Sequence, residues 1–213
     1  MKMACGDDQT RPEQETAMGN NKIRGKSIWP YIVLAAILFI LSVSIGLSTS
    51  PELNSDALEE LIQTLKPILE SLGALGPAAL ILFIFLNNAI KALISMLLGI
   101  VFGLPTLFFI GSNGFIIGIT VAALQTHVGY GVIIASLAPH GIIEIPILLL
   151  TSALGLKIGA ESIRFLIGQK SFVKAHIVRS LKIYTRYVLA CLFIAAVIEV
   201  VITPMIIALA GGK

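Results

Sequence analysis

Apolar residues form five long runs along the chain, and polar residues gather between these runs. The runs lie near 28–48, 77–101, 104–126, 133–156 and 187–210. About 20 apolar residues suffice for a helix to cross a bilayer, and an open sheet edge in lipid would leave backbone groups unsatisfied. The pattern predicts an all-α polytopic membrane helix bundle of about five transmembrane helices, some broken or re-entrant, plus interfacial amphipathic helices.

The segments between the runs differ from one another in periodicity and charge. Residues 1–26 are polar without apolar periodicity, which predicts a disordered cytoplasmic tail. Residues 51–73 and 160–184 show apolar residues at helical spacing. The first predicts an outer, acidic amphipathic helix, and the second an inner, basic helix on anionic lipid. We therefore expect residues 27–213 to form a single transmembrane domain.

Composition and charge agree with this interpretation and orient the chain. Hydrophobic residues make up 56% and charged residues 13%, and a mean hydropathy of +0.94 excludes an ordinary soluble domain. Bases dominate residues 157–186 and are scarce in 51–73, which predicts a cytoplasmic N-terminus and an outside C-terminus in the cell (plasma) membrane. The net charge of +3 comes from bases flanking the spans, so no nucleic-acid partner is expected.

Glycine and proline leave two details open in the middle of the chain. The sequence from Gly103 to Pro105 separates the second and third runs, although a re-entrant hairpin over 95–128 is an alternative. Gly114, Gly118 and Ala122 form a stripe of small residues. Such a stripe favours close packing inside the bundle, and a homodimer contact is the alternative.

Polar residues inside the apolar runs are candidates for function because burying them in lipid is costly. At about 1.5 Å per residue, Lys91 lies roughly 20 Å and Glu144 roughly 17 Å below the outer face, and Glu199 lies roughly 18 Å from the inner face. We predict an intramembrane polar cluster made of Asn87, Asn88, Lys91, Asn113, His140, Glu144 and Glu199.

The charges in this cluster suggest two interpretations. Lys91 is expected to pair with Glu144 or Glu199, which leaves one acid in excess. That excess favours a proton- or cation-responsive centre, whereas the alternative is a structural network that fixes helix register. His140 and Glu144 have the spacing of two helical metal ligands, but Pro139 and the absence of a nearby third ligand argue against metal. No metal, cofactor or catalytic residue is predicted, and no nucleophile lies beside a base, so we expect no enzyme.

Short motifs rich in glycine, asparagine and proline are spaced across about residues 77–160. They are, in order, Phe85-Leu86-Asn87-Asn88, Leu98-Gly99 with Gly103, Asn113-Gly114 with Gly118, Pro139-His140-Gly141 with Glu144 and Pro146, and Leu154-Gly155 with Gly159. This succession resembles the stage II sporulation protein M family. The resemblance implies a multi-pass membrane protein, whose namesake anchors and scaffolds a complex with peptidoglycan-degrading enzymes during engulfment.

Two functions of different classes follow. The first is a non-catalytic scaffold for a membrane or cell-envelope complex, with residues 51–73 as the docking site for an extracytoplasmic protein. The second is a transporter or channel for an ion or small solute that uses the predicted polar cluster. The expected partners are the lipid bilayer and, for the scaffold, an extracytoplasmic protein. A second copy of the chain, in contact through the small-residue stripe, is a further candidate partner.

Overall fold

The computed structural model describes residues 27–49, 76–125 and 130–211, and it contains no strand within those ranges. The first four helices are α2 (Trp29–Thr49), α4 (Pro77–Leu98), α5 (Leu104–Leu124) and α6 (Tyr130–Leu166). A last helical run follows as α7 (Val173–Ile183), the π-helical turn η2 (Tyr184–Val188), α8 (Leu189–Val197), the π-helical turn η3 (Ile198–Ile202) and α9 (Thr203–Gly211). The predicted all-α bundle is confirmed.

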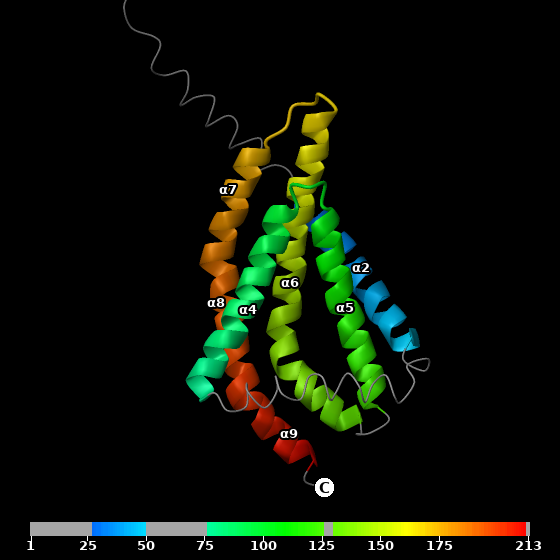
Figure 1. Ribbon diagram of the computed structural model, residues 1–213, viewed down its shortest axis with the longest axis vertical. Helices are drawn as coiled ribbons and strands as arrows, with labels where there is room; N and C mark the ends of the chain where they lie inside the picture. Colours follow the sequence, from blue (N-terminus) through cyan, green and yellow to red (C-terminus); the bar gives the residue numbers. More distant parts are fainter. Residues whose placement is uncertain (1–26, 50–75, 126–129, 212–213) are drawn as a thin grey trace, which may run out of the picture.

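The described helices run along one axis and cross the bundle five times, each pass opposite in direction to the one before. Figure 1 shows the start of α2, the α4–α5 turn, the end of α6 and the start of α7 at one end of the bundle, and the C-terminus at the other. Five helical stretches are long and apolar enough to cross a membrane: α2, α4, α5, Gly141–Leu166 and Val173–Leu209. The chain is therefore a multi-pass membrane protein.

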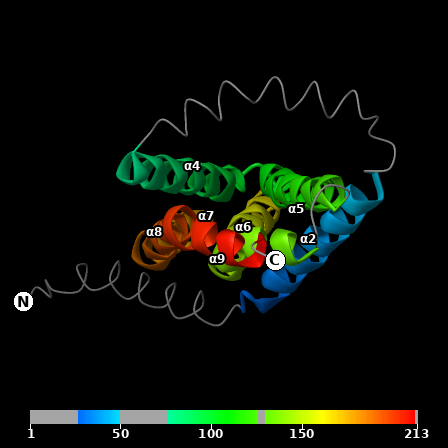
Figure 2. The same cartoon turned by 90° about the horizontal axis from the view of Figure 1, so that it is seen from below.

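Helix α6 is the centre of the bundle. It packs against α2, α4, α5, α7, α8 and α9, and Figure 2 shows it between α4 and α5 on one side and α8 and α9 on the other. Its 37 residues exceed the predicted span over 133–156, and they include Pro139 and Pro146. Figure 1 shows the first part of α6 bent away from the rest, as expected where prolines remove helical hydrogen bonds.

Helices α2 and α5 touch backbone to backbone through glycine. A methyl group on Gly118 would overlap the carbonyl oxygen of Val43 and lie 2.9 Å from the Cα of Gly46. A methyl group on Gly114 would lie 2.7 Å from the carbonyl oxygen of Phe39. The small-residue stripe is thus used for packing within the chain, and α5 is one continuous helix of 21 residues, long enough to span rather than re-enter.

Helix α6 meets the α4–α5 turn through a second set of glycines. Gly99 lies against Gly155, and Gly103 lies against Gly159, in both cases too closely for a side chain. Gly103 also has a φ of 78°, the left-handed conformation that glycine adopts without strain. Beside the turn, the buried Thr106 hydroxyl donates to the carbonyl of Ser95 at 2.8 Å. These contacts fix α6 at the end of the bundle where α4 and α5 join.

The basic region is not the single interfacial helix predicted over 160–184. Helix α6 continues to Leu166, residues 167–172 form a connection without regular helix, and α7 begins a run that continues into α9. One face of α7 is buried, with His176 and Ser180 both 3% exposed. The segment packs on the bundle through this side, where Val173, Ile177 and Leu181 contact the core. Predictions for residues 1–26 and 51–73 lie outside the described residues.

Candidate functional site

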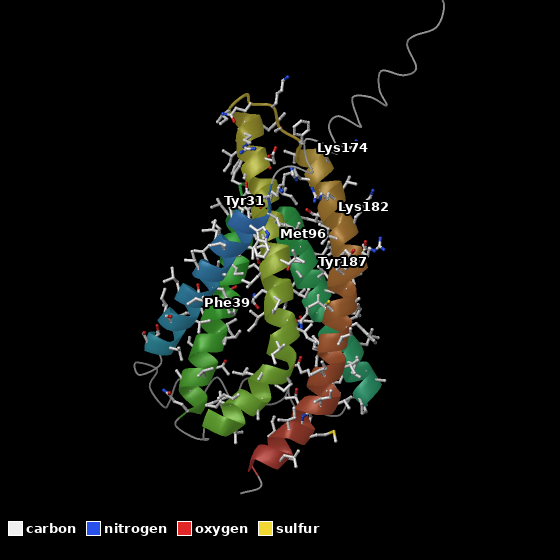
Figure 3. All side chains as sticks on the ribbon, turned by 180° about the vertical axis from the view of Figure 1, so that it is seen from behind. Tyr31, Phe39, Met96, Lys174, Lys182 and Tyr187 are labelled. Carbon is white, nitrogen blue, oxygen red and sulfur yellow. The ribbon has the colours of Figure 1, made fainter. Side chains whose placement is uncertain are left out.

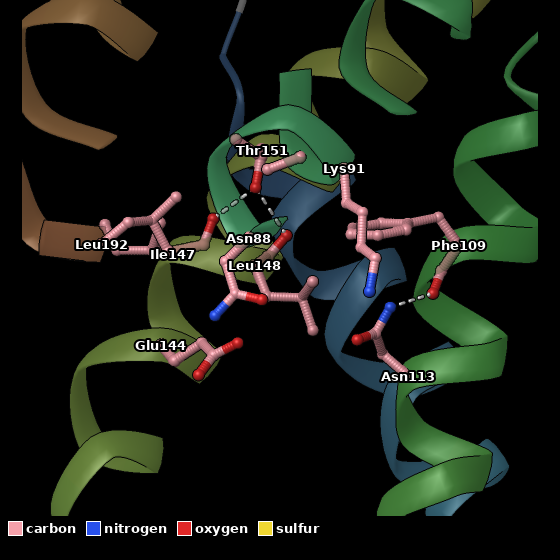
Figure 4. Close-up of a pocket in the computed structure, with 10 residues that line it drawn as sticks. Asn88, Lys91, Phe109, Asn113, Glu144, Ile147, Leu148, Thr151 and Leu192 are labelled. Atoms are coloured by element: carbon pink, nitrogen blue, oxygen red, sulfur yellow. Dashed lines mark hydrogen bonds between the residues drawn. The ribbon is translucent and has the colours of Figure 1, made fainter. Parts of the chain in front are cut away.

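A polar cavity of about 50 Å³ lies where α4, α5, α6 and α8 meet. Its walls combine polar and apolar side chains: Asn88, Lys91, Ala92, Phe109, Asn113, Glu144, Ile147, Leu148, Thr151 and Leu192. Figure 4 shows Lys91, Asn113 and Glu144 reaching into this space from different helices. A cavity of this size has room for a few water molecules, each of which needs roughly 10–15 Å³.

The local helix geometry positions each polar side chain. Asn88 and Lys91 are three residues apart on α4, so they share a face. The Asn113 amide donates to the carbonyl of Phe109 at 2.7 Å, which ties this side chain to the wall formed by α5. The Thr151 hydroxyl donates to the carbonyl of Leu148 at 3.1 Å, one turn earlier on α6. The helices therefore hold amide, amine and carboxylate groups in fixed positions around the cavity.

Lys91 lies at the mouth of the cavity. Its side chain belongs to the cavity lining and is also exposed at the surface. Among residues 27–49, 76–125 and 130–211, no ion pair joins Lys91 to Glu144 or Glu199. The predicted direct pair is absent because the Lys91 amine points toward Asn113 and lies across the cavity from Glu144 (Figure 4).

The structure brings together four of the seven predicted residues and places two elsewhere. Asn88, Lys91, Asn113 and Glu144 line the cavity. Asn87 donates to the Oδ1 of Asn88 at 3.4 Å from outside the lining. Glu199 lies in the π-helical turn η3, which packs against α4 and α6, and is not part of the wall. The seventh, His140, is in α6, and its side chain is outside the described residues.

Metal binding has no support from the described part of the chain. No group of three His, Cys, Asp or Glu side chains occurs there in an arrangement that could hold a metal ion. In the cavity itself, Glu144 is the acidic member of the lining, and amide oxygens supply the other acceptors. What this arrangement can do is bind water, a proton or a small ion between an amine and a carboxylate.

A second charged cluster, which the sequence did not predict, joins α6 to α7. Glu161 is 2% exposed; its Oε1 accepts from Arg164 Nη1 at 2.9 Å, and its Oε2 accepts from the backbone N–H of Phe172 at 3.1 Å. The Nε2 of His176 lies 4.0 Å from Oε1, and Lys157 is buried nearby on α6, 6% exposed. Glu161 thereby holds the start of α7 against the end of α6.

One sequence signal could have revealed the Glu161 cluster. Glu161 is the single acid among seven bases over residues 157–186, and His176 and Ser180 recur at helical spacing on the face opposite the bases. A single carboxylate among several bases can accept hydrogen bonds from them inside the fold, so it need not be a solvated surface charge. The positive-inside pattern hid this local role because it averages charge over the whole segment.

Comparison with known proteins identifies the family. Residues 32–204 match the family described as "Stage II sporulation protein M". A protein described as uncharacterized, from Methanocaldococcus jannaschii, is 34% identical over 126 residues, which cover 57% of this chain and 70% of that protein. No solved structure matches the chain.

The match covers most of the described structure, including the cavity and the glycine contacts. The glycines that suggested the resemblance are the ones that let helices touch, at Gly99 with Gly155, at Gly103 with Gly159, and at Gly118 with Gly46. The Asn88 and Asn113 that suggested it line the cavity. The chain belongs to the stage II sporulation protein M family.

Proposed function

We propose that the chain moves protons or a small cation through the membrane by way of the polar cavity. The observation that supports this function is the cavity itself, where an amine, a carboxylate and two amides from three helices surround space for water. Lys91 lines this space and is also exposed. Its amine is therefore open to water or an ion that enters the cavity.

Glu144 is the group that binds and releases the transported ion, and Lys91 sets its affinity. A carboxylate inside the membrane is a candidate group for binding a proton or a cation. An amine on the facing wall competes with that ion for the carboxylate. Asn88 and Asn113 supply donors and acceptors that can orient bridging water.

Flux through purified protein in liposomes tests this proposal. Liposomes containing a pH-sensitive dye receive a potassium diffusion potential, and a parallel set is given a sodium gradient. Wild-type protein should carry protons or sodium above the rate of protein-free liposomes, and Glu144→Gln should abolish that flux. The matched control is Glu199→Gln, since it removes a second intramembrane carboxylate that does not line the cavity.

Two results would overturn the proposal. Wild-type flux equal to that of empty liposomes would exclude conduction of these ions. Equal flux through wild type and Glu144→Gln would exclude the role of Glu144. Gel filtration of each variant shows whether loss of flux reflects loss of folded protein.

Membership in the family supports a second function, that of a non-catalytic scaffold in the plasma membrane. In this case the cytoplasmic N-terminus and outside C-terminus predicted from charge place residues 51–73 outside the cell, where they dock a protein partner. Affinity capture with the full chain should then retain a partner that is lost when 51–73 is replaced by a glycine–serine linker. Capture that does not depend on 51–73 would contradict this site.

A further inference from the structure

The exposed face of α7 and of the following turn η2 has a row of bases that the proposed transport does not use. Lys182 and Arg186 are four residues apart, so they lie one above the other on this face. Lys174 is two turns earlier on the same side and is also exposed. The opposite face, with His176, Ser180 and Tyr184, is buried against the bundle.

A hydrogen bond fixes the depth of these bases. The buried Tyr184 hydroxyl donates to the carbonyl of Ala89 at 2.6 Å. Ala89 lies roughly 14 Å before the end of α4, at about 1.5 Å per residue. This part of α7 therefore lies beside the last turns of a membrane-spanning helix and not beyond its end. Figure 3 shows Lys182 and Tyr187 alongside Tyr31 and Met96, with Lys174 farther toward the end of the bundle.

The outer surface changes from basic to apolar directly after Arg186. Tyr187 is 55% exposed, and the next exposed large side chains of this helix are Phe193 and Ile194. The Arg186 guanidinium lies 5.8 Å from the centre of the Tyr187 ring. A tyrosine below a pair of cations is typical of the boundary between headgroups and hydrocarbon. Lys182 and Arg186 thus lie directly beside the point where the exposed surface becomes apolar.

We propose that Lys182 and Arg186 bind the phosphate of an anionic phospholipid whose acyl chains lie on the apolar surface below Tyr187. Two stacked cations select an anion, and the adjoining apolar surface selects an amphiphile, so the two features together select a lipid. A second copy of the chain is a poor occupant because it would bring the same bases together. This site differs from a helix lying flat on the membrane, since one face of α7 is packed on α4 and α6.

Lipid binding by the purified full-length chain tests the proposal. Native mass spectrometry in neutral detergent measures the binding of phosphatidylglycerol and of phosphatidylcholine. Lys182→Gln with Arg186→Gln should weaken phosphatidylglycerol binding by roughly thirtyfold, about fivefold for each base, and leave phosphatidylcholine binding unchanged. Lys170→Gln with Lys174→Gln is the matched control, because it removes the same charge from exposed positions farther from Tyr187.

The outcomes separate a specific site from general attraction. A loss confined to the Lys182 and Arg186 pair supports the site. An equal loss in both pairs overturns it, because net charge would then explain the binding. Unchanged phosphatidylglycerol binding in both pairs also overturns it, because the bases would then make no contribution to lipid binding. The assay measures no flux, so its failure is distinct from failure of the proposed transport.

Discussion

A single methyl group at Gly118 should loosen the bundle, because α2 and α5 touch there through their backbones. In Gly118→Ala the new Cβ would overlap the Val43 carbonyl oxygen and lie 2.9 Å from the Cα of Gly46. Neither neighbour can rotate away, since both are main-chain atoms of a helix. The two helices must therefore separate by about 1 Å, a gap that forfeits roughly a quarter to a half of each dispersion contact at the crossing.

The size of this effect follows from two opposing terms. Replacing glycine by alanine within a helix contributes about 1 kcal/mol of stability through backbone propensity. Overpacking a tight contact costs about 1–3 kcal/mol, and more where backbone opposes backbone. The matched control is Gly111→Ala in the same helix, whose methyl would meet the Ser42 hydroxyl at 3.5 Å, an ordinary contact distance. Gly111→Ala gains the propensity term without the penalty, so the two variants should differ by the penalty alone, about 2–3 kcal/mol in the upper part of that range.

Thermal unfolding in detergent measures this difference. At about 2–4 °C per kcal/mol for a chain of this size, Gly118→Ala should melt roughly 4–12 °C below Gly111→Ala. Gly111→Ala itself should melt at or above the wild-type temperature. Equal melting temperatures for the two variants would refute the backbone contact between α2 and α5.

Two further substitutions test the contacts that place α7. Glu161→Gln should lower the free energy of unfolding by about 1–2 kcal/mol, because it replaces charged hydrogen bonds by neutral ones, while the partly exposed Arg164 partner contributes little. Faster tryptic cleavage after Lys170, in the connection between α6 and α7, would show that α7 is held less firmly. Unchanged cleavage would contradict this role of Glu161. Tyr184→Phe should lower the melting temperature by roughly 2–6 °C through loss of a buried hydrogen bond. Tyr187→Phe, at an exposed position, should change the melting temperature little. Equal changes in melting temperature for the two variants would count against the hydrogen bond that places this helix beside α4.

The sequence predicted the helices well because length and apolarity decide them. A run of about 20 apolar residues has few alternatives to a membrane helix, so α2, α4 and α5 begin and end within a few residues of the expected positions. The end of α6 was harder to predict. Its last turns carry Lys157 and Glu161, which resemble solvated charges in sequence and are buried in the structure.

The candidate site was predictable only in part. Helical rise placed Lys91 and Glu144 at similar depths, and both line one cavity. Depth gives no information about rotation around each helix axis or about the angle between helices. The approach of α6 to the α4–α5 turn depends on glycine contacts, and Glu199 lies outside the cavity wall although its estimated depth is similar.

Water access to the cavity is the most direct test of its role. In a background without native cysteines, Asn113→Cys places a thiol in the cavity wall, and Ile110→Cys places one on the same helix at a fully buried position. Both are exposed to a membrane-impermeant, charged thiol reagent in liposomes. The account predicts that Asn113→Cys reacts and Ile110→Cys does not. Protection of both thiols, with the protein folded, would contradict a cavity reached by water.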